Sequence, residues 1–173
     1  MVGEIEQVLD ALNRACVRYL VVGGVAVVLH GHLRTTADLD LVIQLERGNV
    51  LRAMSALRDL QYRPRAPVPS EAFAEREVRG EWIREKGLAV FSLWSPGHPT
   101  LEVDVFVSEP FDFDAVYARA VRVPLERSEV TVIALQDLIA LKRQVGRPRD
   151  QEDVAALESL RDADGRTEGG RDG

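Results

Sequence analysis

The stretch RTTADLDLVI, Arg34–Ile43, decides how this chain is interpreted. Its apolar residues, Leu39 and Leu41 among them, are typical of a buried strand, yet Asp38 and Asp40 interrupt the run. Side chains alternate across a strand, so both aspartates lie on one face, ~6.6 Å apart. At an effective dielectric constant of ~20, two bare carboxylates repel each other there by about 2.5 kcal/mol. A cation, a proton or exposure to water has to offset that repulsion.

Working outward from this strand, hydrophobic spacing predicts an alternation of helices and strands. Helices are expected over 1–18, 25–31, 47–60, 111–120, 135–144 and 150–160, with a short one after Ser70. Strands are expected over 19–22, 38–43, 87–94, 100–107, 121–125 and 130–134. Two strands adjoin directly without a helix between them. This pattern predicts an α/β fold with a small mixed β-sheet flanked by helices.

Length and composition predict one domain over residues 1–161, followed by a disordered tail over residues 162–173 that has almost no apolar side chains. The single cysteine, Cys16, excludes an internal disulfide. No signal peptide and no membrane-spanning run is visible, so we expect a cytoplasmic protein with no membrane partner. The formal net charge of −6 argues against a surface that binds nucleic acid generally.

A third carboxylate lies in the strand expected over residues 100–107, where Asp104 interrupts the run TLEVDVFV. Taken alone, Asp104 is equally well explained as an edge residue facing water. Adjacent strands are about 4.8 Å apart, so Asp104 beside Asp38 and Asp40 would form a compact oxygen cluster. Such a cluster suits Mg²⁺ when phosphates complete its shell, and two such ions can clamp a phosphoryl displacement.

Gly23 and Gly24 follow a predicted strand and precede a predicted helix. Exposed backbone N–H groups at that place would favour a phosphate. The alternative is an ordinary tight turn. A second candidate for contact with phosphate is the basic cluster of Lys142, Arg143, Arg147 and Arg149, although basic residues at a helix end also complement its dipole.

Taken together, these residues resemble the nucleotidyltransferase superfamily of the polymerase-beta type. VGG, then DLDLVI, then the separate aspartate of EVDVFV carry the resemblance, which covers Val22 to about Asp153. RTTADLD and LIALKRQVGRPRDQEDVAAL are more narrowly similar to minimal bacterial nucleotidyltransferases grouped with the type IV toxins of abortive-infection systems. The resemblance implies that Asp38 and Asp40 bind two Mg²⁺ ions, for which Mn²⁺ can substitute, and that Asp104 completes the site.

The same resemblance implies that Gly23 and Gly24 hold the nucleotide phosphates and that Lys142 contacts the triphosphate. Arg34 precedes the strand of Asp38 and could pair with an aspartate or reach a phosphate. Asp150 and Asp153 are explained equally well by capping and surface charge. His98 lies in a Pro/Gly turn and is expected to be exposed.

The functional hypothesis is transfer of a nucleoside monophosphate from an NTP to an acceptor hydroxyl, with release of pyrophosphate. A tRNA end, a protein side chain and a small molecule are all open as acceptors. The resemblance also implies a possible toxin with a cognate antitoxin partner. The alternative is a non-catalytic or antitoxin-type partner module that keeps the fold without turnover.

Overall fold

A computed structural model describes residues 2–168, and its centre is a mixed β-sheet. Within that range the sheet has seven strands in the order β3-β4-β5-β2-β1-β7-β6. The strands are β1 (Tyr19–Val21), β2 (Asp38–Ile43), β3 (Arg63–Pro64), β4 (Val90–Trp94), β5 (Glu102–Phe106), β6 (Val121–Pro124) and β7 (Glu129–Val132). The predicted mixed sheet with flanking helices is therefore confirmed.

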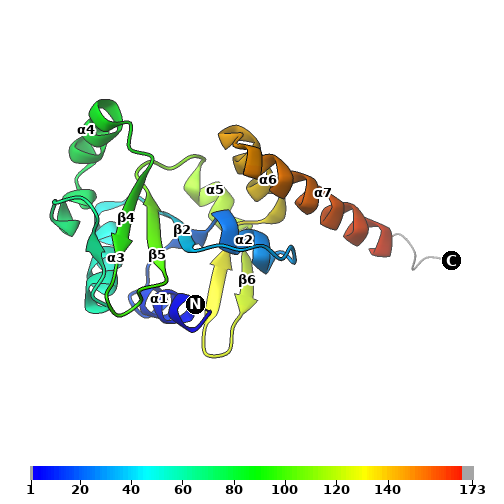
Figure 1. The fold of residues 1–173 in the computed structure, drawn as a ribbon, viewed down its shortest axis with the longest axis horizontal. Coiled ribbons are helices and arrows are strands. Elements are labelled where there is room, and N and C mark those ends of the chain that lie inside the picture. Colours follow the sequence, from blue (N-terminus) through cyan, green and yellow to red (C-terminus); the bar gives the residue numbers. More distant parts are fainter. Residues whose placement is uncertain (1, 169–173) are drawn as a thin grey trace.

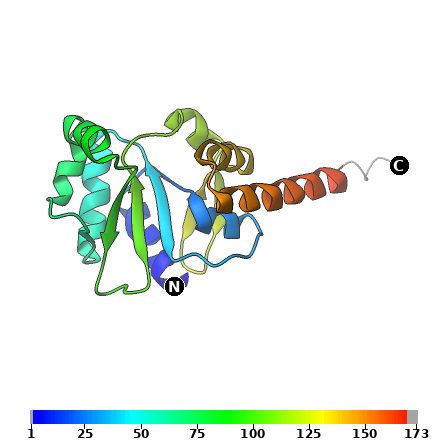
Figure 2. The same cartoon turned by 45° about the horizontal axis from the view of Figure 1, so that its top comes forward.

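Helices surround this sheet and gather at its two ends (Figure 1). They are α1 (Val2–Arg14), α2 (Gly23–Leu29), α3 (Arg47–Asp59), the 3₁₀ helix η1 (Ser70–Ala74), α4 (Arg76–Lys86), α5 (Phe113–Ala118), α6 (Leu135–Val145) and α7 (Pro148–Glu168). Helices α3 and α4 lie at the end of the sheet formed by β3 and β4, whereas α6 and α7 lie at the other end, near α2 (Figure 2).

The strand pairing places two distant parts of the chain side by side. β2 runs antiparallel to β1 and parallel to β5. Parallel neighbours need a long crossover, and residues 44–101 supply it with α3, η1, α4 and strands β3 and β4. β4 and β6 each pair antiparallel with the next strand along the chain, as short turns allow. The parallel pairing of β2 with β5 is what joins the two aspartate-bearing strands.

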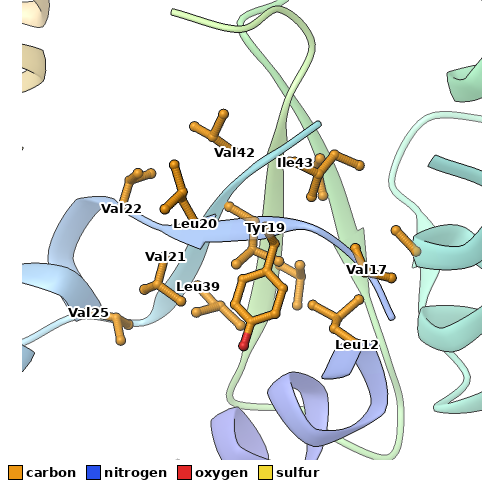
Figure 3. Close-up of a cluster of buried hydrophobic side chains, with 14 of the residues drawn as sticks. Leu12, Val17, Tyr19, Leu20, Val21, Val22, Val25, Leu39, Val42 and Ile43 are labelled. Carbon is orange, nitrogen blue, oxygen red and sulfur yellow. The ribbon is translucent and has the colours of Figure 1, made fainter. Parts of the chain in front are cut away.

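The core lies on both faces of the central strands. Figure 3 shows Leu12 of α1 on the same side of the sheet as Tyr19 and Leu39, with Leu20 and Val42 on the opposite side. All five side chains are buried. The residues of β2 that alternate with Leu39 therefore share the face of Val42, and Asp38 and Asp40 are among them.

Two local expectations need correction, and one helix was not predicted. Helix α1 ends at Arg14 rather than near residue 18, because Cys16 has a left-handed backbone with φ 52°. Helix α4 has only Arg79 and Trp82 buried, so its sequence lacked the apolar periodicity that would have predicted it. Helix α7 continues to Glu168, so the tail predicted to be disordered from residue 162 is helical up to that point, and 169–173 lie outside the described residues. None of the helices in the described range is both long and apolar enough to cross a membrane.

Candidate active site

Two of the predicted aspartates lie next to each other on neighbouring strands. In the parallel register of β2 and β5, Asp40 is opposite Asp104, and Asp38 is opposite Glu102. On the other side of β5, Asp104 is opposite Ser92 of β4. A strand spacing of about 4.8 Å brings the Asp40 and Asp104 side chains together on one face of the sheet. Asp38 lies on the same face and is exposed.

The surroundings of Asp40 disfavour its charge. Burial raises its pKa from 3.8 to about 6, and the negative charges of Asp104 and Asp38 add to this effect. A hydrogen bond from the Gly24 backbone and the positive charge of Lys142 act in the opposite direction. A carboxyl group with a pKa near neutrality can exchange a proton or accept a cation at little cost.

The surroundings of Asp104 also disfavour its negative charge. Burial raises its pKa, and the charges of Asp38 and Glu102 raise it further, while a hydrogen bond with Ser92 lowers it. Its Oδ1 atom is buried and has no hydrogen-bond partner among the described residues. Buried polar atoms are nearly always paired, so an unpaired carboxylate oxygen points to a ligand that belongs there.

The glycine pair leaves space for neighbouring side chains, Gly23 for Asp40 and Gly24 for Thr36 and Arg34. Gly23 has a left-handed backbone with φ 63°, and a Cβ atom there would lie 1.9 Å from Oδ2 of Asp40. A Cβ atom on Gly24 would lie 2.6 Å from Oγ1 of Thr36 and 3.2 Å from Nη2 of Arg34. A side chain at Gly23 would therefore force Asp40 to move, and one at Gly24 would force Thr36 to move. The predicted role of the pair in holding phosphates stays a prediction, and the contacts show a role that sequence reasoning missed.

The two predicted phosphate-binding cations, Lys142 and Arg34, share one carboxylate, that of Asp153. Nζ of Lys142 lies 2.7 Å from Oδ2 of Asp153 and 3.2 Å from Oδ1 of Asp150. Arg34 forms an ion pair with the same Oδ2 of Asp153. Lys142 and Asp153 are only 5% and 3% exposed. Arg34 thereby joins the loop before β2 to helices α6 and α7.

Asp153 was not predicted as part of the site. The only sequence signal was its place on the helix that follows Lys142, and a surface aspartate looks the same. A buried lysine needs a counter-charge, but the sequence alone does not show that Lys142 is buried.

His98, expected to be exposed, is buried in the turn before β5. Its Nε2 lies 3.0 Å from Oε1 of Gln7, and its Nδ1 lies 3.2 Å from the hydroxyl of Tyr62.

The donor set suits a hard divalent cation. Among residues 2–168, no three His, Cys, Asp or Glu side chains form a ready metal-binding group. Mg²⁺ does not require one, because it is usually bound through one or two carboxylates with substrate phosphates completing its shell. Asp40 and Asp104 are adjacent, and Oδ1 of Asp104 is buried and unpaired. They therefore supply the two carboxylates that such a site needs.

Comparison with known proteins identifies a family for this chain. The sequence pattern of a family described as "Nucleotidyltransferase of unknown function (DUF6036)" matches residues 1–164. That description mentions no toxin subgroup. None of the curated proteins matches the chain significantly in sequence.

Several solved structures share the fold at low sequence identity. The lincosamide antibiotic adenylyltransferase LnuA, solved with lincomycin bound, has a TM-score of 0.62 and 14% identity over 92% of this chain and 98% of its own. The antibiotic-resistance factor ANT(2'')-Ia has a TM-score of 0.55 and 14% identity, over 97% of this chain and 92% of its own. The complex of ANT(2")-Ia with adenylyl-2"-tobramycin has a TM-score of 0.51 and 14% identity, over 94% of this chain and 95% of its own. At this identity the likeness shows the fold alone.

Proposed function

This chain belongs to the nucleotidyltransferase family DUF6036, and we propose that it uses divalent cations to move a nucleoside monophosphate from an NTP to an acceptor hydroxyl. The observation that carries the proposal is the pairing of Asp40 with Asp104 across adjacent strands, with Oδ1 of Asp104 buried and unpartnered. Repulsion between the two carboxylates is the cost that a bound cation would remove.

The residues present fit Mg²⁺, and Asp38, Asp40 and Asp104 would hold it, with two ions expected and Mn²⁺ able to substitute. When bound, the ions would neutralise phosphate charge and stabilise the charge that develops in the transition state. Asp104 would take the proton of the acceptor hydroxyl, since its raised pKa makes it a better base than an ordinary aspartate.

The reaction balances without any further reactant. The acceptor oxygen forms a bond to the α-phosphorus of the NTP, and the bond from that phosphorus to the bridging oxygen of the β-phosphate breaks. Pyrophosphate leaves with the bonding electrons, and the hydroxyl proton passes to Asp104. Lys142 and Arg34 would place positive charge near the phosphates. Their ion pairs with Asp153 partly neutralise that charge.

We propose a small molecule as the acceptor. Two of the proteins that share the fold are described by what they modify or bind, a lincosamide antibiotic in one case and adenylyl-2"-tobramycin in the other. The net charge of −6 disfavours a polyanionic acceptor. A tRNA end or a protein side chain, with a toxin role, is the second candidate. Its support is the similarity of the segment around Lys142 and Asp153 to the toxin subgroup.

Two measurements test the proposal. Mg²⁺ with an NTP is expected to raise the melting temperature, because a ligand that binds only the folded state stabilises it. The double variant Asp38→Ala/Asp40→Ala should lose that rise, whereas Asp59→Asn, an exposed site on α3, should keep it. A full rise in the double variant would show that these carboxylates are not the site.

The second measurement follows label from each α-labelled NTP into tobramycin, lincomycin, total tRNA or cell extract. Asp104→Asn should abolish transfer while sparing much of the NTP-dependent stabilisation. Undiminished labelling by Asp104→Asn would refute its role as the base. Label in tRNA or protein alone would favour the toxin hypothesis, and no label with any acceptor would favour a non-catalytic module.

A further inference from the structure

A cavity of about 390 Å³ lies at the start of β2 and β5, before the paired aspartates Asp40 and Asp104. Asp38 and Glu102 line it, and these two residues are opposite each other in the register of β2 and β5. They lie two residues before Asp40 and Asp104, on the same face of the sheet. Two residues along a strand span ~6.6 Å, so a molecule in this cavity lies within a short reach of the base proposed above. The volume is typical of a small-molecule site.

An indole forms part of the cavity wall. Trp94, at the end of β4, is 38% exposed and is one of few large apolar side chains in the described range that face solvent. Trp82 is buried in a stack with Phe73 and Phe91, so it contributes to the core instead. The Trp94 ring has no comparable aromatic stack among residues 2–168. It is available as a platform for a ligand.

A positively charged side chain already lies over the Trp94 ring. The guanidinium carbon of Arg65 lies 5.7 Å from the ring centroid. Arg65 also makes two hydrogen bonds to Glu102, of 3.1 and 3.0 Å. An aromatic face and a carboxylate at its edge are the two elements that recognise a cation in proteins. Arg65 is exposed, so a ligand cation could displace it or bind beside it at low cost.

The charge of the cavity favours a cation over an anion. Two carboxylates, Asp38 and Glu102, face one guanidinium, that of Arg65. No residue of the described range forms an ion pair with Asp38. The phosphates of an RNA end would meet this negative charge, whereas an amine would be attracted by it.

We propose that this cavity is the acceptor site and that it takes a small hydroxylated molecule bearing a positive charge, with Trp94 as its platform. This inference rests on the proposed function and names its acceptor class. The charged group lies between the Trp94 ring and Glu102, and a hydroxyl of the same molecule is directed toward Asp104. Trp94 and Glu102 thus set specificity, while the aspartates of β2 and β5 serve the reaction.

The test uses the fluorescence of Trp94 in the full chain, isolated by Trp82→Phe. The probes are tobramycin and lincomycin as cationic hydroxylated molecules, maltose as a neutral one, and total tRNA. We expect at least one cationic probe to change Trp94 emission with saturation, and maltose and tRNA to have no such effect. A change caused equally by maltose or tRNA would overturn the requirement for charge. No change with either cationic probe would overturn the acceptor site.

Kinetics provide an independent readout with the probe that becomes labelled. Trp94→Ala and Glu102→Gln should raise KM roughly three- to thirty-fold with little change in kcat, the size expected for a cation–π contact. Ile83→Ala, an equally exposed apolar residue on α4, is the control and should change neither. An unchanged KM in both cavity variants would overturn the inference. The melting-temperature rise with Mg²⁺ and NTP needs no acceptor and tests the nucleotide site of the proposed function, so a failure there is distinguishable from a failure at the cavity.

Discussion

Gly23 lies so close to Asp40 that a methyl carbon on Gly23 would be 1.9 Å from Oδ2 of the aspartate. Gly87 offers a matched comparison, because its φ of 61° nearly equals the 63° of Gly23 while nothing lies within 4 Å of its added carbon. The two glycines separate backbone strain from the contact with Asp40.

We expect Gly87→Ala to lower the free energy of unfolding by roughly 1–2 kcal/mol, the cost of a left-handed backbone for an L-residue. Gly23→Ala should cost more, and it should also remove the melting-temperature rise with Mg²⁺ and NTP, because Asp40 has to move. Urea unfolding and thermal melts of the two variants would measure this. Equal losses, with the ligand response intact in both, would contradict the proposed constraint.

Asp40→Asn should stabilise the ligand-free protein above neutral pH. The pKa of Asp40 rises from 3.8 to about 6 on folding, so its contribution to stability is complete below 3.8 and is lost as the pH rises through about 6. At pH 8 the charged carboxylate therefore destabilises the fold by about 3 kcal/mol at most. Asparagine avoids that cost.

The measurement is urea unfolding with EDTA at pH 8 and at pH 4, with Asp59→Asn as the exposed control. The gain from Asp40→Asn should be present at pH 8 and nearly absent at pH 4. A gain of the same size at both pH values would mean that charge is not its cause.

Asp153→Ala should destabilise the protein strongly. The substitution removes the carboxylate that Lys142 and Arg34 share and leaves the buried Lys142 with Asp150 as its remaining partner. Breaking a buried ion pair costs about 3–5 kcal/mol. Asp162→Ala removes an exposed ion pair with Arg161 and should cost no more than about 1 kcal/mol. Chemical denaturation would compare them. Similar costs would show that the buried pairs contribute little.

Lys142→Met should weaken NTP binding roughly ten- to a hundred-fold, since a charge-assisted hydrogen bond contributes about 1.5–3 kcal/mol. Methionine retains apolar bulk at this buried position. Arg161→Met removes an exposed cation on α7 and should have no such effect. Titration calorimetry with a non-hydrolysable NTP, at a temperature where both variants are folded, would decide. Equal affinities would restrict Lys142 to its ion pairs with Asp150 and Asp153.

Local sequence was sufficient for the parts of the fold that depend on local patterns. The period-2 run around Asp38 and Asp40 predicted β2, and the run around Asp104 predicted β5. The short strand β3 has only two residues and includes Pro64, so no periodicity could reveal it. Helix α4 buries an arginine, Arg79, on its inner face, which conceals its amphipathic pattern.

The candidate site shows the same division. Two aspartates on one strand are visible in sequence, but the pairing of Asp40 with Asp104 depends on which strands become neighbours. The contact of Arg34 with Asp153 depends on how α7 folds back onto the loop before β2. Neither partner carries a pattern that indicates the other. Such contacts are fixed by tertiary packing, which no single-sequence spacing encodes.

The attachment of Arg34 and Lys142 to Asp153 also has a consequence for biosynthesis. Chains emerge from the ribosome N-terminus first, and domains tend to fold as they appear. Arg34 emerges early, but its counter-ion arrives only with α7. A polypeptide released before residue 148 would lack α7, and with it both counter-ions of Lys142 and the counter-ion of Arg34. Such a chain would be less stable and more easily degraded by proteases. Truncated translation products of this enzyme should therefore be cleared by the cell before they can bind and sequester nucleotides.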